Sequence, residues 1–151
     1  MDKKSILIID DDKAILKSFK SILELKGFRV ATAENGREAL EKVCSDFFNL
    51  ALIDIRLPDM DGTSLLQEFQ QLVPTMKKVM ITGYSTEENA IDSLNLGADG
   101  YLRKPVMPGR LLKFLSDKLT EQESENMIFE DIVNDLIRTR SRDLQNFERR
   151  A

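Results

Sequence analysis

The chain has 151 residues, of which 42% are hydrophobic and 32% charged, and its formal net charge is −4. This length suits one globular domain, and the balance of apolar and charged residues excludes a disordered chain. The sequence has no histidine, which excludes histidine catalysis and a phosphohistidine carried by this chain. The single cysteine, Cys44, excludes an internal disulfide. The acidic charge argues against direct nucleic-acid binding through a broad basic face.

The N-terminus does not resemble a signal peptide, because its apolar run covers only residues 6–9 and is followed by three aspartates. No stretch approaches the roughly 20 apolar residues of a membrane helix. We therefore expect a cytoplasmic protein without membrane contact.

Short apolar runs alternate with amphipathic segments along the chain. Residues 6–9 are apolar at every position, as in a strand buried on both faces. From Ile15 to Leu23 the apolar residues recur at helical spacing, and Gly27 predicts the end of that helix. The same reasoning predicts further strands at 28–33, 49–55, 78–82 and 100–103, and further helices at 36–46, 65–72, around 90–94 and from Pro108 to Leu119.

Five strand-then-helix units within residues 1–119 predict an α/β fold, a doubly wound five-stranded parallel sheet with helices on both faces. Ligands of such sheets bind at the carboxyl ends of the strands. The residues that follow each strand are therefore the candidates for a functional site.

Polar side chains that suit phosphoryl transfer stand at four of these strand ends. Residues 10–12 are all aspartate, Asp54 ends the third strand, Thr82 ends the fourth and Lys104 follows the fifth. Clustered carboxylates repel one another unless they bind protons or a cation, and oxygen ligands favour Mg²⁺. A lysine and a hydroxyl can bind the phosphoryl group, and an aspartate is a suitable nucleophile.

The motifs at these strand ends resemble those of response-regulator receiver domains of two-component signalling, which are CheY-like. The matching segments are Ile8-Ile9-Asp10-Asp11-Asp12, Leu52 to Gly62, Met80-Ile81-Thr82-Gly83 and Gly97 to Pro105. The resemblance spans about residues 4–119 and implies a flavodoxin-like sheet of order 2-1-3-4-5.

The resemblance also implies a role for each matching residue. Asp54 would accept a phosphoryl group from a sensor histidine kinase or a phosphotransfer protein, and the domain would catalyse only its own phosphorylation and dephosphorylation. Asp10, Asp11, Asp54 and the backbone carbonyl of Arg56 would bind Mg²⁺. Lys104 would pair with the phosphoryl oxygens. The Lys104–Pro105 peptide bond would be cis. Thr82 would bind the phosphoryl group, and Tyr101 would then turn inward.

Other interpretations of the same residues are open. Asp12 fits a helix N-cap. Asp59-Met60-Asp61-Gly62-Thr63 fits the nucleophile motif of haloacid-dehalogenase-like phosphatases, although Leu57 and Pro58 separate it from the strand end. Asp59, Asp61, Gly62 and Glu68 fit four positions of an EF-hand loop, but Leu57 stands where the first acidic ligand belongs. A receiver-like scaffold that works without phosphorylation is a further hypothesis.

Residues 120–151 differ in composition from the rest of the chain. Residues 120–137 contain six acids and no base, and residues 138–151 contain five arginines and two acids. Apolar residues from Phe129 to Phe147 recur at helical spacing, which predicts a helix that either continues the preceding one or restarts near Met127. We expect residues 120–151 to form a charged helical tail or linker. This tail is either a packed or partly frayed helix, or a helix that binds a partner.

The sequence does not identify partners other than the kinase. The output is expected to be a changed protein–protein surface on an unidentified target. A homodimer could form through the later helices of the receiver or through the tail. The chain is either a stand-alone receiver or the N-terminal part of a longer DNA-binding regulator.

Overall fold

A computed structural model describes residues 3–83 and 92–150. The elements are β1 (Ser5–Ile9), α1 (Lys13–Leu25), β2 (Arg29–Ala33), α2 (Gly36–Ser45), β3 (Leu50–Asp54), α3 (Gly62–Leu72), β4 (Lys77–Thr82), β5 (Gly100–Arg103) and α5 (Pro108–Arg150). Residues 92–95 are helical as well. Ala90 and Ile91, on which the prediction of that helix partly rests, lie outside the described residues.

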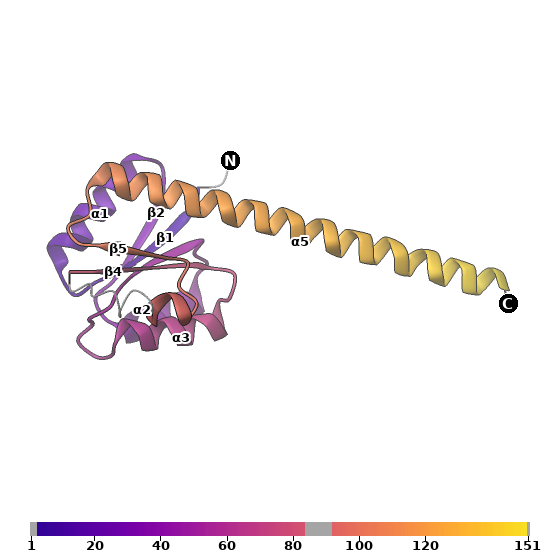
Figure 1. Ribbon diagram of the computed structural model, residues 1–151, viewed down its shortest axis with the longest axis horizontal. Helices are drawn as coiled ribbons and strands as arrows, with labels where there is room; N and C mark the ends of the chain where they lie inside the picture. The colour runs from indigo at the N-terminus through magenta and orange to yellow at the C-terminus, as the bar shows by residue number, and fades with distance from the viewer. Residues whose placement is uncertain (1–2, 84–91, 151) are drawn as a thin grey trace. The chain divides into compact units, whose positions relative to one another are not determined.

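The five strands form one parallel sheet of order β2-β1-β3-β4-β5, as predicted. Every residue of β1 and β3 is buried, because these strands lie inside the sheet with helices on both faces. Figure 1 shows α2 and α3 on one side of the sheet and α1 with the first turns of α5 on the other.

Alternate strand residues supply two separate cores. Leu7, Ile9 and Ile53 pack with α2 and α3, whereas their neighbours Ile6, Ile8 and Leu52 pack with α1 and α5. This alternation fixes which face of the sheet each side chain occupies.

Two glycines follow helix ends, and for Gly27 the sequence predicts this. Gly27 and Gly97 have φ angles of +90° and +96°, a region that favours glycine over residues with a Cβ. The N–H of Gly27 donates to the carbonyl of Glu24, and the N–H of Phe28 donates to that of Leu23. These bonds satisfy carbonyls in the last turn of α1, and they direct the chain from α1 toward β2.

The tail is helical, and it continues the preceding helix without a restart near Met127. The helix α5 has 43 residues and ends at Arg150. The chain divides between Leu119 and Thr120 into two compact units. Among the described helices, including this long one, none has an apolar stretch that could cross a membrane.

Candidate functional site

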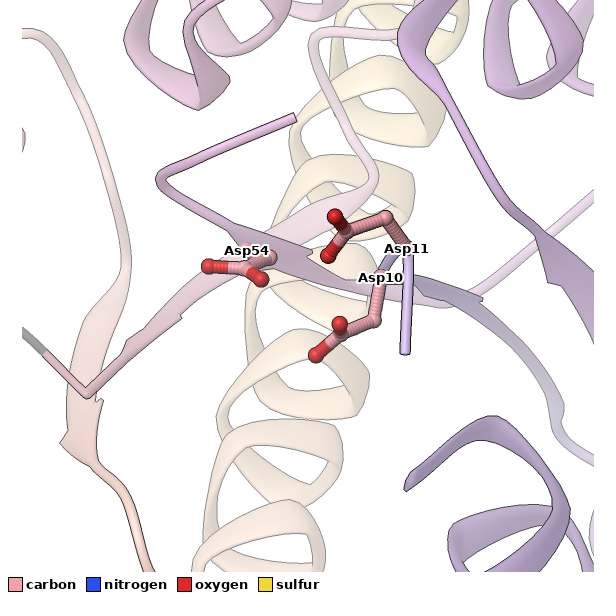
Figure 2. Close-up of side chains that lie close together, drawn as sticks. All are labelled: Asp10, Asp11 and Asp54. Atoms are coloured by element: carbon pink, nitrogen blue, oxygen red, sulfur yellow. The ribbon is translucent and has the colours of Figure 1, made fainter. Parts of the chain in front are cut away.

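The predicted polar residues meet at the carboxyl edge of the sheet. Asp10 follows β1, Asp54 is the last residue of β3, and Lys104 follows β5. The strand β3 lies between β1 and β4, so parallel pairing brings residues 10 and 54, which are 44 positions apart in the sequence, to adjoining strand ends. Figure 2 shows the side chains of Asp10, Asp11 and Asp54 gathered at this place.

The three aspartates form an acidic cluster. One carboxylate oxygen from each of Asp10, Asp11 and Asp54 lies within 4.8 Å of those from the other two. Asp10 and Asp54 are buried, with exposed fractions of 3% and 7%, whereas Asp11 is exposed. Buried carboxylates at this separation repel one another and require a positive charge nearby.

Lys104 supplies part of that positive charge. Its Nζ donates to Asp10 Oδ2 at 2.7 Å and to Asp54 Oδ2 at 3.2 Å. Burial lowers the pKa of Lys104, but its hydrogen bond to Asp10 and the charges of Asp10 and Asp54 outweigh burial and raise that pKa overall. The Lys104–Pro105 peptide bond is cis, as expected from the resemblance.

Opposing interactions act on the pKa of Asp54. Burial and the charge of Asp10 raise its pKa, against the lowering effect of Lys104 and of the Arg56 N–H. That N–H donates to Asp54 Oδ1 at 3.2 Å. The net effect is a raised pKa, so the ionised side chain is less favourable here than in water and gains from a cation.

The donor set fits a hard cation such as Mg²⁺. Oxygens bound to one Mg²⁺ lie at most about 4.2 Å apart, twice the usual ligand distance, and the acidic cluster already holds its three oxygens within 4.8 Å of one another. Magnesium keeps several waters, and so three carboxylates are enough protein ligands. The predicted fourth ligand, the Arg56 carbonyl, stays a prediction.

Asp12 caps α1, as the sequence predicts. Its Oδ1 accepts the N–H groups of Ala14 at 2.9 Å and Ile15 at 3.4 Å. The N–H of Asp12 in turn donates to Asp10 Oδ1 at 2.9 Å. The cap therefore also fixes the Asp10 carboxylate, whose other oxygen contacts Lys104.

Thr82 and Tyr101 lie on neighbouring strands, on the same face of the sheet. Tyr101 pairs with Met80 and Arg103 with Thr82. Thr82 is fully buried, and its carbonyl accepts the N–H of Lys104 at 2.8 Å. The Tyr101 hydroxyl is shielded from solvent, and it has no hydrogen-bond partner in the part of the chain that the structure describes. Burial raises its pKa, with Arg103 opposing.

Asp59 has a structural role that the sequence motifs do not indicate. Its Oδ1 accepts the N–H of Gly36 at 2.9 Å, and its Oδ2 accepts that of Arg37 at 3.0 Å. The carboxylate thus binds the first N–H groups of α2, and this holds its pKa below the ordinary value. Asp59 is exposed and belongs to no candidate cation cluster among residues 3–83 and 92–150, so neither the phosphatase nor the EF-hand hypothesis gains support.

Gly62 ends one of the segments that resemble the receiver family, but the resemblance assigns it no role at the site. A Cβ at this position would lie 2.2 Å from the carbonyl oxygen of Asp54 and 2.8 Å from Ile55 Cα. The N–H of Gly62 donates to the Ile55 carbonyl at 2.6 Å. The start of α3 therefore packs directly on the backbone that carries Asp54. A glycine shortly after a strand-end aspartate is the sequence signal that could have indicated this close packing.

Comparisons with known proteins agree with this geometry. The sequence profile of the response regulator receiver domain matches residues 6–116. The chain is 38% identical over 118 residues to the transcriptional regulatory protein ZraR of Klebsiella oxytoca, which covers 78% of this chain and 27% of ZraR. It therefore spans about a quarter of the length of that relative.

Solved structures show the same arrangement. A CheY-like receiver domain protein from Methanospirillum hungatei JF-1 is 54% identical, with a TM-score of 0.80, and the alignment covers 82% of this chain and 99% of that one. A response regulator from Burkholderia pseudomallei is 30% identical, with a TM-score of 0.72 and coverage of 82% and 73%. That structure contains a phosphorylated aspartic acid, a calcium ion and citrate.

Proposed function

The chain belongs to the response-regulator receiver family, and on this premise we propose that Asp54 is its phosphoryl acceptor. The observation that carries the proposal is the ammonium of Lys104, which bridges Asp10 and Asp54 beside the exposed carboxylate of Asp11. This arrangement combines an aspartate nucleophile, a cation site and a donor for phosphoryl oxygens at one strand edge.

The reaction is an in-line transfer to the Asp54 carboxylate. One carboxylate oxygen attacks the phosphorus and forms the O–P bond of an acyl phosphate. The bond from phosphorus to the donor breaks, and the electron pair leaves with the imidazole of a phosphohistidine on a partner protein. We propose a sensor histidine kinase or a phosphotransfer protein as that donor, because this chain has no histidine of its own.

Magnesium, when bound, would neutralise charge that develops on the transferred phosphoryl oxygens. We propose that Asp10, Asp11, Asp54 and the Arg56 carbonyl hold it. The Burkholderia pseudomallei neighbour contains both a phosphorylated aspartic acid and a calcium ion, which supports a proposal that combines an aspartyl phosphate with a divalent cation.

Lys104 and Thr82 would then stabilise the product. Lys104 already lies within hydrogen-bond distance of Asp54, and it can transfer one of its N–H donors to a phosphoryl oxygen. Thr82, at the end of the neighbouring strand β4, would hydrogen-bond a second oxygen, and Tyr101 would reposition as Thr82 moves. The acyl phosphate replaces one negative charge with about two, which supplies the energy for the switch.

The domain serves signalling and is not a metabolic enzyme. We propose that its only catalysis is its own phosphorylation and the hydrolysis of its acyl phosphate, and that it works in the cytoplasm. The output would be a changed protein-binding surface. The match to about a quarter of ZraR, a transcriptional regulator, favours a receiver joined to a transcriptional output as the second candidate.

A substitution test separates Asp54 from the other acids. We expect wild-type chain incubated with acetyl phosphate and Mg²⁺ to gain the mass of one phosphoryl group. Asp54→Asn should gain none, and the matched control Asp59→Asn should gain it as wild type does. Labelling of Asp54→Asn, or loss of labelling in Asp59→Asn alone, would contradict the proposal.

A further inference from the structure

The amino edge of the sheet, opposite the edge that carries Asp54, contains a groove that the proposed phosphoryl transfer does not use. Residues 43–48, which lead from α2 to β3, line it together with residues 72–76, which lead from α3 to β4, and its volume is about 530 Å³. The helices α2 and α3 lie next to each other on one side of the sheet (Figure 1). The strand β3 has five residues and is about 16 Å long, so the groove and Asp54 are separate sites.

The groove combines buried and exposed apolar side chains. Val43, Phe48 and Met76 line it and are at most 8% exposed, whereas Phe47 and Leu72 line it and are 68% and 53% exposed. Small-molecule sites usually have volumes of about 300–1,000 Å³ and mainly apolar or aromatic linings. The groove therefore has the size and lining of a site for a small organic molecule, and such a molecule would cover two exposed apolar side chains.

Buried and local polar contacts fix the backbone on both sides of the groove. Lys78 is fully buried, and its Nζ donates to the Val73 carbonyl at 2.6 Å. The N–H of Met76 donates to the same carbonyl at 3.1 Å. On the other side, the hydroxyl of Ser45 donates to the Glu41 carbonyl at 3.1 Å. The groove is therefore formed before any ligand binds.

A second cavity adjoins the groove and carries positive charge. The two cavities share Asp46 and Phe47, and the second, of about 390 Å³, is also lined by Lys3, Lys4 and Arg29. With three cations and one acid, its described lining has a net charge of +2, although the whole chain has a net charge of −4. The Asp46 carboxylate already accepts the N–H of Phe47 at 2.8 Å. A local excess of positive charge in an acidic protein attracts anions.

The two adjoining cavities select one chemistry of ligand. An apolar body in the groove would cover Phe47 and Leu72, and an anionic group joined to it would reach the basic side chains on the other side of Phe47. Lysine and arginine bind carboxylate or phosphate oxygens through charge-assisted hydrogen bonds. A cationic ligand of the same shape would meet the three basic side chains as like charges, which repel it.

We propose that the groove and the adjoining basic cavity form one binding site for a small amphipathic anion, an organic molecule with an apolar body and an anionic group. The apolar body packs against Phe47 and Leu72, and the anionic group binds Lys3, Lys4 and Arg29. These residues are at the amino edge of the sheet, so the inference stands or falls separately from the proposed phosphoryl transfer.

The first experiment uses Cys44 as a reporter of occupancy, because it lines the groove, is exposed and is the only cysteine of the chain. The full chain is alkylated with iodoacetamide, an uncharged reagent, and intact mass gives the rate. We expect saturating 4-phenylbutyrate to slow the alkylation about fivefold or more, since a bound ligand covers most of its site. The matched probe 4-phenylbutylamine has the same apolar body and the opposite charge, and should slow it less than about twofold. Equal protection by the two probes, or none by 4-phenylbutyrate, overturns the proposal.

A substitution in the basic cavity tests the contact with the anionic group. Arg29 is exposed, and Arg29→Gln should raise the concentration of 4-phenylbutyrate for half protection about threefold. The matched control Lys17→Gln removes one positive charge from an exposed position of α1 that lines neither cavity, and should leave that concentration unchanged. Equal effects of the two substitutions would show general attraction by net charge, and would overturn the proposal.

A substitution in the groove tests the apolar contact. Leu72→Asn should raise the concentration for half protection about fivefold. The matched control Leu25→Asn changes a leucine that is 86% exposed and lines neither cavity, and should bind as wild type does. Circular dichroism checks that both variants keep their fold, and labelling by acetyl phosphate should be the same in both. Wild-type protection of Leu72→Asn by 4-phenylbutyrate would overturn the proposal.

Discussion

Lys104 contacts both buried carboxylates of the site, at 2.7 Å from Asp10 and 3.2 Å from Asp54. We predict that Lys104→Ala lowers the free energy of unfolding by about 1–3 kcal/mol at neutral pH, less than for a fully buried pair because the lysine is partly exposed. Added Mg²⁺ should recover part of the loss by replacing the missing charge. Urea denaturation with and without Mg²⁺ measures both effects.

The matched control for that variant is Lys13→Ala. Lys13 is 80% exposed and lies 3.8 Å from Glu34, so its removal should change stability by less than about 1 kcal/mol. Equal losses in the two variants would show that Lys104 contributes no more than a surface lysine.

Asp54, the proposed phosphoryl acceptor, is less favourable in its ionised form within the fold than in water. Its pKa is raised, chiefly by burial and then by Asp10. The folded chain therefore holds this proton to higher pH than the unfolded chain, and the stability from the protonated form is lost as pH rises through the folded pKa. Asp54→Asn should raise the melting temperature at pH 7 without Mg²⁺, and the gain should vanish below about pH 4.

Thermal unfolding followed by circular dichroism checks this prediction, with Asp117→Asn as the control. Asp117 is exposed on α5, and its amide variant should melt close to wild type at both pH values. A destabilised Asp54→Asn at pH 7 would show that Lys104 and the Arg56 N–H outweigh burial.

Residue identity alone does not reveal every buried charge. Periodicity places Lys78 in a strand. It does not predict that the Lys78 side chain is fully buried. Its ammonium donates to the Val73 carbonyl at 2.6 Å and to Gln70 Oε1 at 3.1 Å, and burial lowers its pKa to about 8. Those acceptors come from the end of α3, which no local pattern places beside β4.

The helix α2 depends on an acid from a distant loop. Asp59 accepts the N–H groups of Gly36 and Arg37, and its pKa is lowered by these bonds. We predict that Asp59→Ala costs about 0.5–1 kcal/mol of stability at neutral pH. With a lowered folded pKa, this contribution is present above about pH 4 and is lost as pH falls through the folded value.

Denaturant unfolding at pH 7 and near pH 3 measures the Asp59 contribution and its loss. Asp61→Ala is the control, because Asp61 stands at the N-cap of α3 without a side-chain capping bond. If Asp61→Ala costs as much as Asp59→Ala, the bonds to α2 are not the cause.

The junction between β3 and α3 leaves no room for a side chain at Gly62. A Cβ there would meet the backbone of Asp54 and Ile55, which cannot move without shifting the Asp54 side chain. Gly62→Ala should cost about 1–3 kcal/mol and weaken Mg²⁺ binding measured by calorimetry. Gly109→Ala, with nothing within 4 Å, should be neutral or stabilising. Unchanged Mg²⁺ binding in Gly62→Ala would contradict this role.

Local patterns were sufficient to predict the elements but not their long-range contacts. The predicted strands 6–9 and 78–82 differ from β1 and β4 by one residue at one end, because the apolar runs and the polar residues that follow them mark those boundaries. The bond from the Gly36 N–H to Asp59 joins residues 23 positions apart. The lack of room for a Cβ at Gly62 arises only once α3 packs on β3. The apolar spacing of the tail fits both a continuous α5 and a restart near Met127, although no Gly or Pro after Gly109 interrupts the helix.

The whole chain consists of two compact units that meet between Leu119 and Thr120. We propose that residues 1–119 are the receiver and 120–151 the tail. A chain that ends at Leu119 should then keep its cooperative unfolding and its labelling by acetyl phosphate. Denaturant unfolding and intact mass on the two lengths check this. A shortened chain that aggregates or takes up no phosphoryl group would show that the receiver requires the tail.

Locating the acyl phosphate within the wild-type chain is the most direct test of the proposed chemistry, because it requires no substitution. The chain is treated with acetyl phosphate and Mg²⁺, the acyl phosphate is reduced with borohydride, and the modified residue is identified by peptide mass spectrometry. We predict modification at Asp54 alone, and none when Mg²⁺ is removed with a chelator. Modification at Asp59, Asp10 or Asp11, or an equal yield at Asp54 without Mg²⁺, would contradict the proposed site.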